Sequence, residues 1–480
     1  MIRTPFATAA VTLLVTATAP AVLAAPATAQ TRSISSSDRA QGARANPQLL
    51  AEYGGAYRGP QAAYVTRVGQ RVAVQSGLSN AQNDFTVTML NSPVENAFAI
   101  PGGYVYVTRQ LVGLMNSQDE LAFVLGHEVG HVAAQHSTKR NTRSSIGQML
   151  ASGLGALTGS SIISSIAGTG AKLYALGYSR NQEYEADTLG VRYSAASGYD
   201  PHAASDILTG LEAETTLEAR IAGRNAKATP GWASTHPNSA DRIARARALA
   251  AKTGRPDGTT RQDVDYLRML DGMAYDDDAA QGTVSGQTFL HRDMKLKFVA
   301  PTGYTIANGT DAVTVSGTGG QAQFKSAAAT GDLSGFVAAQ FRALGANAGT
   351  ATLATQPNGI RYAYQTVRAT ANNRAVDVTL VAYAMPSATP FFTVVTPAGQ
   401  GVGAFGSMLG SVAPLTNAQA AAIKGKRIKI ATVGARDTVD TLARQMAYPD
   451  YQRDRFLTLN GLTANATLRP GMLVKLVVEG

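Results

Sequence analysis

Between Ser117 and His136 the chain reads SQDELAFVLGHEVGHVAAQH. Apolar residues recur here at the spacing of an amphipathic helix, and Ser117 with Glu120 forms an S-x-x-E capping box at its start. The sequence therefore predicts a helix. Within it, residues 127–131 read HEVGH, an HExxH motif. Its two histidines are four residues apart, so both imidazoles project from one face and can bind a single ion.

The HExxH motif indicates hydrolysis with zinc. A peptide bond resists water at neutral pH, whereas zinc held by neutral imidazoles lowers the pKa of bound water toward about 7. Glu128, one step round the helix, can take a proton from that water and pass it to the leaving amine. The alternative is a helix with two unrelated histidines, but three of the six histidines in the chain lie in this stretch.

The third metal ligand could come from one of three places in the sequence: His136, the acidic segment near Glu183, or His236. His136 lies five residues after His131, which places it about 140° round a continuing helix. We therefore expect His136 to be structural or a contact at the rim of the site.

Carboxylates gather in a second predicted helix, from about Ser179 to Ser197. Glu183 and Asp187 lie one turn apart on a shared face, whereas Glu185 points nearly the opposite way. This face can supply one carboxylate to the metal and another to the outer nitrogen of a ligand histidine, which would fix its tautomer. The alternative is a solvated acidic face.

The composition of the 480 residues limits the other possibilities. Hydrophobic residues make up 45% and charged residues 15%, which excludes wholesale disorder and allows about three domains. Cysteine is absent, so disulfide frameworks, thiol catalysis and cysteine zinc sites are excluded. The net charge of +10 favours anionic surfaces, but nucleic acid is not expected as a partner because no nucleic-acid-binding motif is present.

Residues 1–29 are predicted to be a cleaved signal peptide, which implies export to the periplasm. Arg3 precedes an uncharged stretch ending in Ala27-Thr28-Ala29, the small-residue pattern that signal peptidases accept. The alternative is an uncleaved N-terminal anchor. A second uncharged stretch, residues 144–171, is long enough to span a membrane, but its many glycines favour a Gly/Ser-rich helix or flap.

Four segments in order resemble the zinc metallopeptidase family of the CAAX prenyl protease and HtpX, nearest to its soluble periplasmic, BepA-like branch. They are NAFAIPGGYVYV at 96–107, HEVGHVAAQH at 127–136, SRNQEYEAD at 179–187 and STHPNSADRI at 234–243. The resemblance extends from about residue 46 to residue 249. It implies a mainly helical zincin domain of the gluzincin type with a small sheet.

The resemblance also implies a zinc site with one ion per chain. The ligands would be His127, His131 and Glu183, and the general base would be Glu128. Asp187 would orient a ligand histidine.

Further residues receive roles from the same resemblance. His236 would lie near the metal, where it would stabilise an oxyanion or block the site at rest. Arg242 would anchor that segment through a carboxylate. If the strand at 104–107 is an exposed edge, an extended polypeptide could pair with it; the alternative is an ordinary internal strand. Substrate contacts are therefore expected at Asn96, Ala97, Tyr104, Val105 and Arg242.

The whole chain is predicted to be an α+β multidomain protein, with the peptidase domain at 30–256. Residues 257–285 would be a connector whose acidic triplet, 276–278, forms a solvated turn. Strand patterns around a helix at 333–344 predict an α+β domain with an antiparallel sheet at 286–412, with a binding or docking role. Residues 413–425 would be a linker.

Residues 426–480 resemble a LysM module, through RDTV at 436–439, LNGL at 459–462 and LRPGMLVKL at 468–476. This resemblance implies a βααβ fold that binds N-acetylglucosamine polymers and so tethers the protein to peptidoglycan. Arg436 replaces the usual glycine, and the alternative is a spacer held by core packing. No 34-residue helical repeat follows the peptidase, so chaperone behaviour that depends on such repeats is not expected.

Two functions follow from these patterns. The favoured one is a secreted or periplasmic zinc endopeptidase that hydrolyses unfolded or damaged envelope polypeptides. The alternative is a non-catalytic envelope adapter that binds polypeptides and cell wall. The presence of every expected metal and base residue favours the enzyme.

Overall fold

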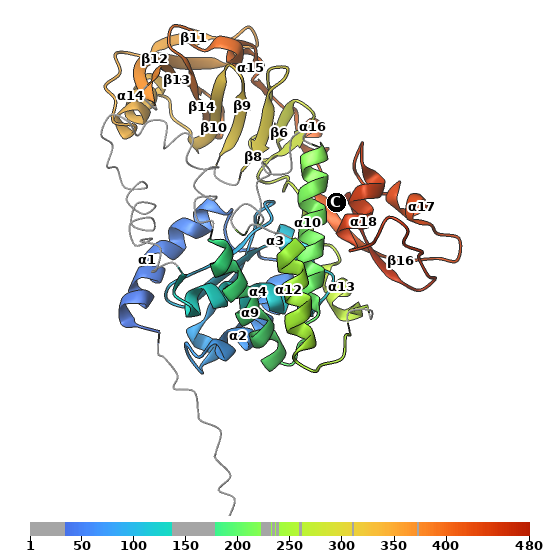
Figure 1. Cartoon of the computed structure of the whole chain (residues 1–480). Helices are drawn as coiled ribbons and strands as arrows, with labels where there is room; N and C mark the ends of the chain where they lie inside the picture. Colours follow the sequence, from blue (N-terminus) through green and yellow to red (C-terminus); the bar gives the residue numbers. More distant parts are fainter. Residues whose placement is uncertain are drawn as a thin grey trace, which may run out of the picture.

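The computed structural model describes residues 34–136, 178–221, 232, 236, 240–258, 262–309, 312–371 and 374–480. The predicted signal peptide and the stretch 144–171 lie outside these residues. Within them, no helix combines the length and apolar character needed to cross a membrane. As predicted, the fold is α+β, with a helical N-terminal region followed by antiparallel sheets (Figure 1).

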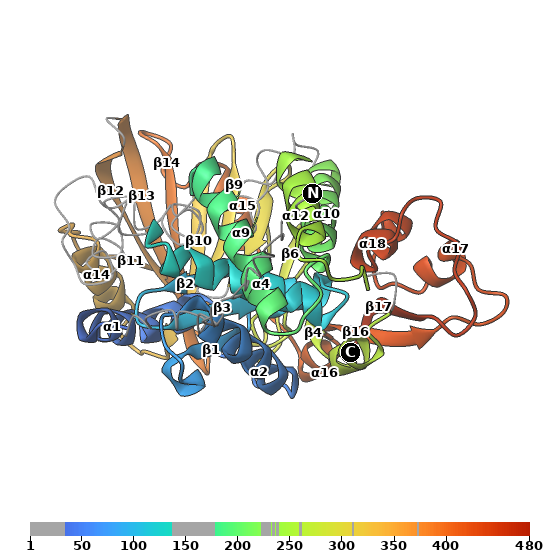
Figure 2. The same ribbon diagram turned by 60° about the horizontal axis from the view of Figure 1, so that its bottom comes forward.

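The N-terminal region contains helices and one small sheet. Its helices are α1 (Ser36–Glu52), α2 (Gln61–Ala73), α3 (Arg109–Leu114), α4 (Gln118–Ala133), α9 (Arg180–Ala196), α10 (Ala203–Ile221) and α12 (Ala240–Ala251). Its strands are β1 (Thr86–Leu90), β2 (Ala97–Ile100) and β3 (Tyr104–Thr108). Helix α4 contacts α2, α9 and strands β2 and β3, so it lies at the centre of this region (Figure 2).

The start of α4 agrees with the sequence pattern. Ser117 accepts a hydrogen bond from the backbone N–H of Glu120 at 3.1 Å, as in a capping box. The carboxylate of Glu120 instead accepts from the N–H of Asn116, at 2.8 Å. Helix α9 also ends as predicted, at Ser197 and a left-handed Gly198 (φ 92°).

Of the two alternatives for residues 104–107, the structure shows the internal strand and not the exposed edge. The sheet order is β1-β3-β2, with β3 paired parallel to β1 and antiparallel to β2. Both hydrogen-bonding sides of β3 are therefore used, and the backbone at Tyr104 and Val105 cannot pair with a substrate. Among the described strands, β2 has one side without a strand partner, and it begins at Ala97 beside Asn96.

The middle region consists of two antiparallel sheets. Their orders are β11-β12-β13-β14-β10-β9-β8 and β15-β7-β6-β5. The bounds are β5 (Thr283–Ser285), β6 (Thr288–His291), β7 (Leu296–Val299), β8 (Thr305–Asn308), β9 (Val313–Gly317), β10 (Gly320–Ala328), β11 (Thr352–Thr355), β12 (Arg361–Ala371), β13 (Arg374–Tyr383), β14 (Ala388–Pro397) and β15 (Ala413–Pro414). A core rich in phenylalanine, including Phe298 and Phe392, joins the sheets.

Three helices belong to the middle region and the chain that leaves it. Helix α14 (Leu333–Ala343) follows the predicted 333–344 closely and packs its apolar face on β12 and β13. Helices α15 (Gly406–Gly410) and α16 (Asn417–Ala421) are short.

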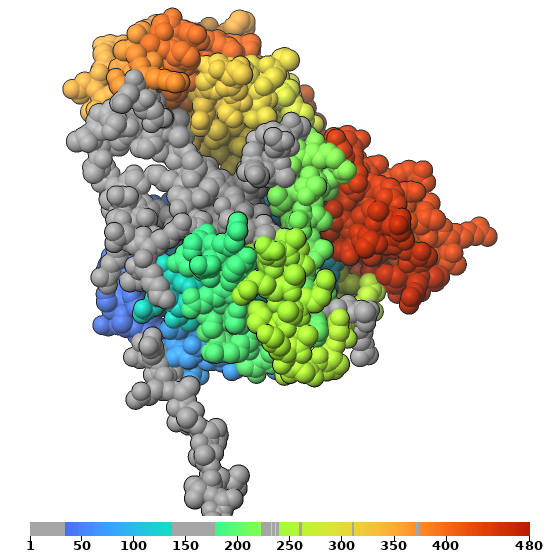
Figure 3. All heavy atoms as spheres, viewed as in Figure 1, coloured from blue at the N-terminus to red at the C-terminus, as the bar shows by residue number. Residues whose placement is uncertain are grey.

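The C-terminal module, residues 426–480, has the element order β16 (Lys426–Thr432), α17 (Val439–Ala443), α18 (Gln452–Leu459) and β17 (Leu473–Glu479). Strands β16 and β17 pair antiparallel. The module shares a hydrophobic core with the N-terminal region, since Ile428, Phe456 and Leu476 belong to the same cluster as Leu125 of α4. Figure 3 shows its surface beside that of α10, which contacts α18.

The acidic triplet at 276–278 is not the solvated turn that we expected. The preceding residues form α13 (Val264–Leu270) and β4 (Ala274–Tyr275), and β4 pairs with β16. Half-buried Asp276 accepts hydrogen bonds from Tyr448 at 2.6 Å and from Gln110 at 3.0 Å. These two hydrogen bonds hold the triplet in place, and through them Asp276 joins the C-terminal module to the N-terminal region.

Candidate metal centre

The site is built where α4 and α9 approach each other closely. Small residues at their crossing permit this approach. A Cβ atom on Gly190 would lie only 3.0 Å from the backbone nitrogen of His127, and one on Gly130 only 3.1 Å from Cβ of Leu189. These glycines therefore allow the carboxylates of α9 to reach the histidines of α4.

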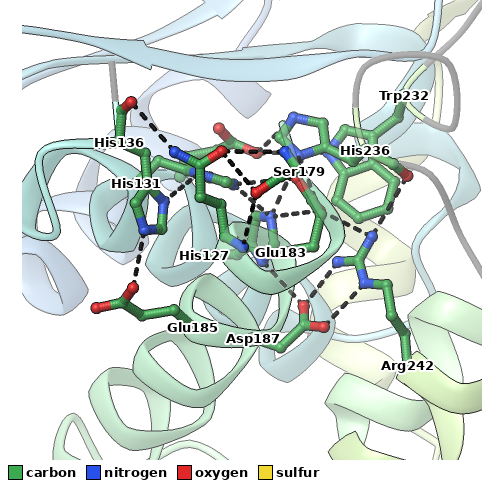
Figure 4. A network of polar contacts seen from close by, with 12 residues as sticks. His127, His131, His136, Ser179, Glu183, Glu185, Asp187, Trp232, His236 and Arg242 are labelled. Atoms are coloured by element: carbon green, nitrogen blue, oxygen red, sulfur yellow. Dashed lines mark hydrogen bonds and ion pairs between the residues drawn. The ribbon is translucent and has the colours of Figure 1, made fainter. Parts of the chain in front are cut away.

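Four side chains converge at this crossing (Figure 4). His127, His131, Glu183 and His236 each offer one donor atom, and these atoms all lie within 4.8 Å of one another. All four residues are buried, with exposed fractions of at most 1%. The structure thus brings together the three predicted metal ligands and adds His236 to the group.

The distances between the donor atoms fit zinc. Nε2 of His127 lies 3.0 Å from Nε2 of His131 and 3.3 Å from Nδ1 of His236. Oε1 of Glu183 lies 3.2 Å from Nδ1 of His236 and 3.6 Å from Nε2 of His131. Donors at 2.0–2.1 Å from a tetrahedral zinc ion are about 3.3 Å apart. Two or three imidazoles with one carboxylate are also a common donor set for this metal.

Asp187 lies where the sequence reasoning placed it. Its Oδ1 is 3.0 Å from Nδ1 of His127, the nitrogen that faces away from the other donors. Arg242 donates to both Asp187 oxygens, at 2.8 and 2.7 Å, and its Nη1 lies 2.9 Å from Glu183 Oε2. One arginine thus holds both carboxylates in position.

The expected substrate contact at Arg242 is wrong. Its exposed fraction is 0%, because the guanidinium is enclosed by Asp187, Glu183 and Trp232. The expected anchoring through a carboxylate is what the structure shows, and Nη1 also donates to the backbone carbonyl of His236 at 3.3 Å. Arg242 therefore links the His236 segment to α9.

Charges around the donors shift their protonation. Burial opposes protonation of His127, but the neighbouring carboxylates of Asp187 and Glu183 raise its pKa to about 9 in the metal-free site. Burial and the neighbouring charge of His127 hold the pKa of His131 well below its usual value. Burial acts to raise the pKa of Glu183, yet the charge of His236, the hydrogen bond with His236 and the nearby charge of His127 bring it below its usual value. A cation that binds here must therefore displace a proton from His127.

Glu128 lies beside the converging donors. Its exposed fraction is 1%, and burial raises the pKa of its carboxyl group. Its Oε1 accepts a hydrogen bond from Nε1 of Trp232 at 3.4 Å and lies 3.5 Å from Nε2 of His236. A buried carboxylate with a raised pKa is suited to accept a proton during catalysis.

Trp232 was not predicted to belong to the site. Its ring stacks on His236, with centroids 4.6 Å apart and planes at 15°, and its carbonyl accepts from the His236 N–H at 2.8 Å. A clue was present, because Trp232 is the only tryptophan in the sequence and precedes His236 by four residues. Tyr178 was also missed; its ring stacks on His131 with centroids 3.7 Å apart.

His136 lies closer to the site than a continuing helix would place it. Helix α4 ends at Ala133, and Gln135 has a positive φ of 56°, so the chain turns back. Nδ1 of His136 then lies 2.9 Å from Nδ1 of His131. The assumed continuation of the helix to residue 136 is therefore wrong.

Known proteins resemble the part of the chain that builds this site. Residues 60–250 match the family model of peptidase family M48. The chain is 32% identical over 202 residues to the mitochondrial metalloendopeptidase OMA1 of Schizosaccharomyces pombe, covering 41% of this chain and 56% of that protein. It is 29% identical over 203 residues to the beta-barrel assembly-enhancing protease of Escherichia coli K12, covering 39% and 38%. The chain thus spans only 38% to 56% of the length of these relatives.

These matches support the predicted resemblance to a metallopeptidase family, and the buried donor set of His127, His131, Glu183 and His236 fits zinc. The matched residues include both helices of the site, α4 and α9, and end before the middle region.

Proposed function

Because residues 60–250 match the family model of peptidase family M48, we propose that this protein is a zinc-dependent endopeptidase that cleaves unfolded or damaged polypeptides. The observation that carries the proposal is the convergence of His127, His131 and Glu183 next to the buried carboxylate of Glu128. A metal centre with a base beside it is an arrangement that supports peptide hydrolysis.

Each residue of the site has a separate role in the proposed reaction. His127, His131 and Glu183 would hold zinc, which would supply the Lewis acidity that metal-assisted hydrolysis uses. Glu128 accepts a proton from the attacking water on its carboxylate and delivers it to the leaving amine nitrogen as the C–N bond breaks. Asp187 holds the outer nitrogen of His127 and so presents Nε2 to the ion.

The side of strand β2 that faces away from β3 could bind an extended substrate through main-chain hydrogen bonds. The strand contacts α4, and β3 is its one partner among the described strands. An extended polypeptide that pairs with its other side would gain main-chain hydrogen bonds with little sequence preference. The backbone N–H and carbonyl of Asn96 are already hydrogen-bonded to Thr108, at 3.0 and 2.9 Å, so the expected substrate contact at Asn96 is not supported. Ala97 is buried, so it would contribute through its backbone. Such binding suits unfolded envelope polypeptides in the periplasm, and the name of the Escherichia coli relative supports that setting.

His236 is proposed to block the site at rest. Its Nδ1 lies 3.2–3.3 Å from both Glu183 oxygens and from His127 Nε2, which is the position of a fourth donor. Its Nε2 faces Glu128 at 3.5 Å. We expect His236→Ala to retain zinc through the other three donors and to cleave faster. Loss of zinc would show that His236 is an essential ligand. Slower cleavage with zinc retained would indicate instead that His236 stabilises the oxyanion.

The function is tested by following the cleavage of an unfolded casein substrate by purified protein. We expect cleavage that a chelator abolishes and that one equivalent of zinc per chain restores. A zinc-loaded protein that binds unfolded polypeptide without cleaving it would instead support the adapter hypothesis.

A second proposal concerns the C-terminal module. Its βααβ order supports the LysM resemblance, and with it binding to the N-acetylglucosamine chains of peptidoglycan. Sedimentation of the full chain with purified peptidoglycan, in competition with N-acetylglucosamine oligomers, tests it. If the protein does not sediment with peptidoglycan, the alternative holds, and the module is a spacer held by core packing.

A further inference from the structure

The outer nitrogen of His131 starts a chain of three polar side chains. Nε2 of His131 faces the other donors, at 3.0 Å from His127 Nε2. Nδ1 points the other way and lies 2.9 Å from Nδ1 of His136. Nε2 of His136 lies 3.1 Å from Oε2 of Glu185 (Figure 4). The chain runs from the metal centre to the surface, because His136 is fully buried while the Glu185 side chain is 53% exposed.

Two features of the backbone hold His136 in this place. The left-handed Gln135 reverses the chain directly after α4 and returns His136 beneath His131. The backbone carbonyl of His136 also accepts a hydrogen bond from Nε2 of Gln182 at 3.3 Å. Gln182 and Glu185 both belong to α9, so His136 is fixed to the helix that carries Glu183.

One arrangement of protons satisfies all these contacts when Nε2 of His131 binds a cation. The neutral ligand then carries its hydrogen on Nδ1, which donates to His136. Nδ1 of His136 must accept this bond, so the hydrogen of His136 lies on Nε2 and donates to Glu185. The carboxylate of Glu185 thus determines which nitrogen of His131 is left to bind the metal.

We propose that His136 and Glu185 are positioning residues that orient His131 for zinc, as Asp187 and Arg242 do for His127. The proposal rests on the proposed function only in taking zinc as the bound ion. The polar partners of metal-bound histidines fix ring orientation and raise ligand basicity, and their loss typically weakens metal affinity by about 10–100-fold. Helix α9 then supplies three carboxylates: Glu183 binds the ion, Asp187 orients His127, and Glu185 orients His131 through His136.

The test measures zinc affinity by competition with a chromogenic chelator. We expect His136→Ala to raise the zinc Kd by about 10–100-fold, since it leaves Nδ1 of His131 buried without this acceptor. His136→Asn should recover part of the affinity, because its amide oxygen can accept from Nδ1. Glu185→Gln should have a smaller effect, since the amide oxygen still accepts but the charge is lost.

Two variants serve as controls. His202→Ala removes a half-buried histidine at the start of α10, and Glu212→Gln changes an exposed carboxylate on α10. Both should keep the Kd within about twofold of the wild-type value. The unfolding midpoint of each metal-free variant shows whether the fold has been lost. If His136→Ala does not fold, the comparison of His136→Asn and Glu185→Gln with wild type carries the test.

A zinc Kd within twofold of wild type in His136→Ala, or an equal loss of affinity in His136→Asn, would overturn the proposal. The proposed function fails by a different result, namely a wild-type protein that binds zinc and does not cleave polypeptide. Because the readout for His136 and Glu185 is metal binding, each proposal can fail while the other stands.

Discussion

Two buried clusters of charged side chains lie at the two ends of α4, and they are built in opposite ways. Near its start, Nζ of Lys475 donates to the backbone carbonyls of Gly113, Leu114 and Met115 at 2.8, 2.9 and 2.8 Å. Lys475 is fully buried, and Glu120 is the carboxylate whose charge acts on it most strongly. This cluster contains its own cation and joins the C-terminal module to the N-terminal region.

The cluster in the second half of α4 consists of donor atoms that face one another. His127, His131, His236 and Glu183 each direct one potential donor atom into one small buried volume, and Arg242 contacts Glu183 on one oxygen. Buried acceptors in this arrangement are stabilised when a cation lies among them. The first cluster therefore joins two parts of the fold, whereas the second is the one that we propose binds the metal.

The largest expected effect comes from removing the base. Glu128→Gln should lower cleavage of unfolded casein by roughly 10²- to 10⁴-fold while zinc content stays at one per chain, because Glu128 moves the proton and does not bind the metal. The matched control is Glu120→Gln, at the other end of the same helix. Cleavage per folded molecule should stay close to wild type in that control, and undiminished cleavage by Glu128→Gln would exclude Glu128 as the base.

The second prediction concerns stability. Lys475→Met should lower the free energy of unfolding by about 2–3 kcal/mol, since three buried carbonyls lose their charged donor. Urea unfolding of the metal-free protein measures this change. Lys429→Met, an exposed lysine on β16, is the control and should have little effect. Equal stability of the two variants would break the distinction between the clusters.

The third prediction is the pH dependence of zinc binding. Because the pKa of His127 is raised to about 9 in the metal-free site, zinc must displace its proton at neutral pH. We expect the apparent zinc affinity to fall about tenfold for each unit that the pH drops below about 9. The metal-free fold has the opposite trend: the stabilisation from protonated His127 is complete below the unfolded pKa of about 6.5 and is lost as the pH rises through about 9. Zinc titrations at several pH values check the first trend, and urea unfolding of the metal-free protein at the same pH values checks the second. A pH-independent zinc affinity would contradict the assignment.

The smallest expected effect concerns Trp232. Trp232→Phe should keep the stacking on His236 but lose the indole N–H that donates to Glu128. Since that donor favours the ionised form, its loss should raise the pKa of Glu128, and the acid limb of the pH profile of kcat/KM should move to higher pH by less than about one unit. An acid limb that does not move would show that the 3.4 Å contact has no influence on the base.

The sequence predicted the parts of this site that depend on local periodicity. Four-residue spacing placed His127 and His131 on one face, and the same spacing placed Glu183 and Asp187 on another. It failed where a helix ends early, because the left-handed Gln135 that redirects His136 leaves no periodic signal. The sequence could not decide whether residues 104–107 form an edge or an internal strand, since the position of β3 between β1 and β2 depends on non-local contacts that spacing does not encode.

In the C-terminal half, too, the sequence predicted local elements but not contacts between distant residues. Alternating residues predicted the strands of the middle region and a helix that matches α14. Burial of Lys475 could not be foreseen, because a lysine in a strand is ordinarily exposed and its acceptors lie about 360 residues away in the sequence.

The central claim is that His127, His131 and Glu183 hold one zinc ion at the crossing of α4 and α9. Metal analysis of dialysed Glu183→Gln beside Glu212→Gln tests it most directly, since both variants replace a carboxylate by an amide. We predict about one zinc per chain in Glu212→Gln and a large loss of zinc in Glu183→Gln, with both proteins folded. Full zinc occupancy in Glu183→Gln would contradict the account.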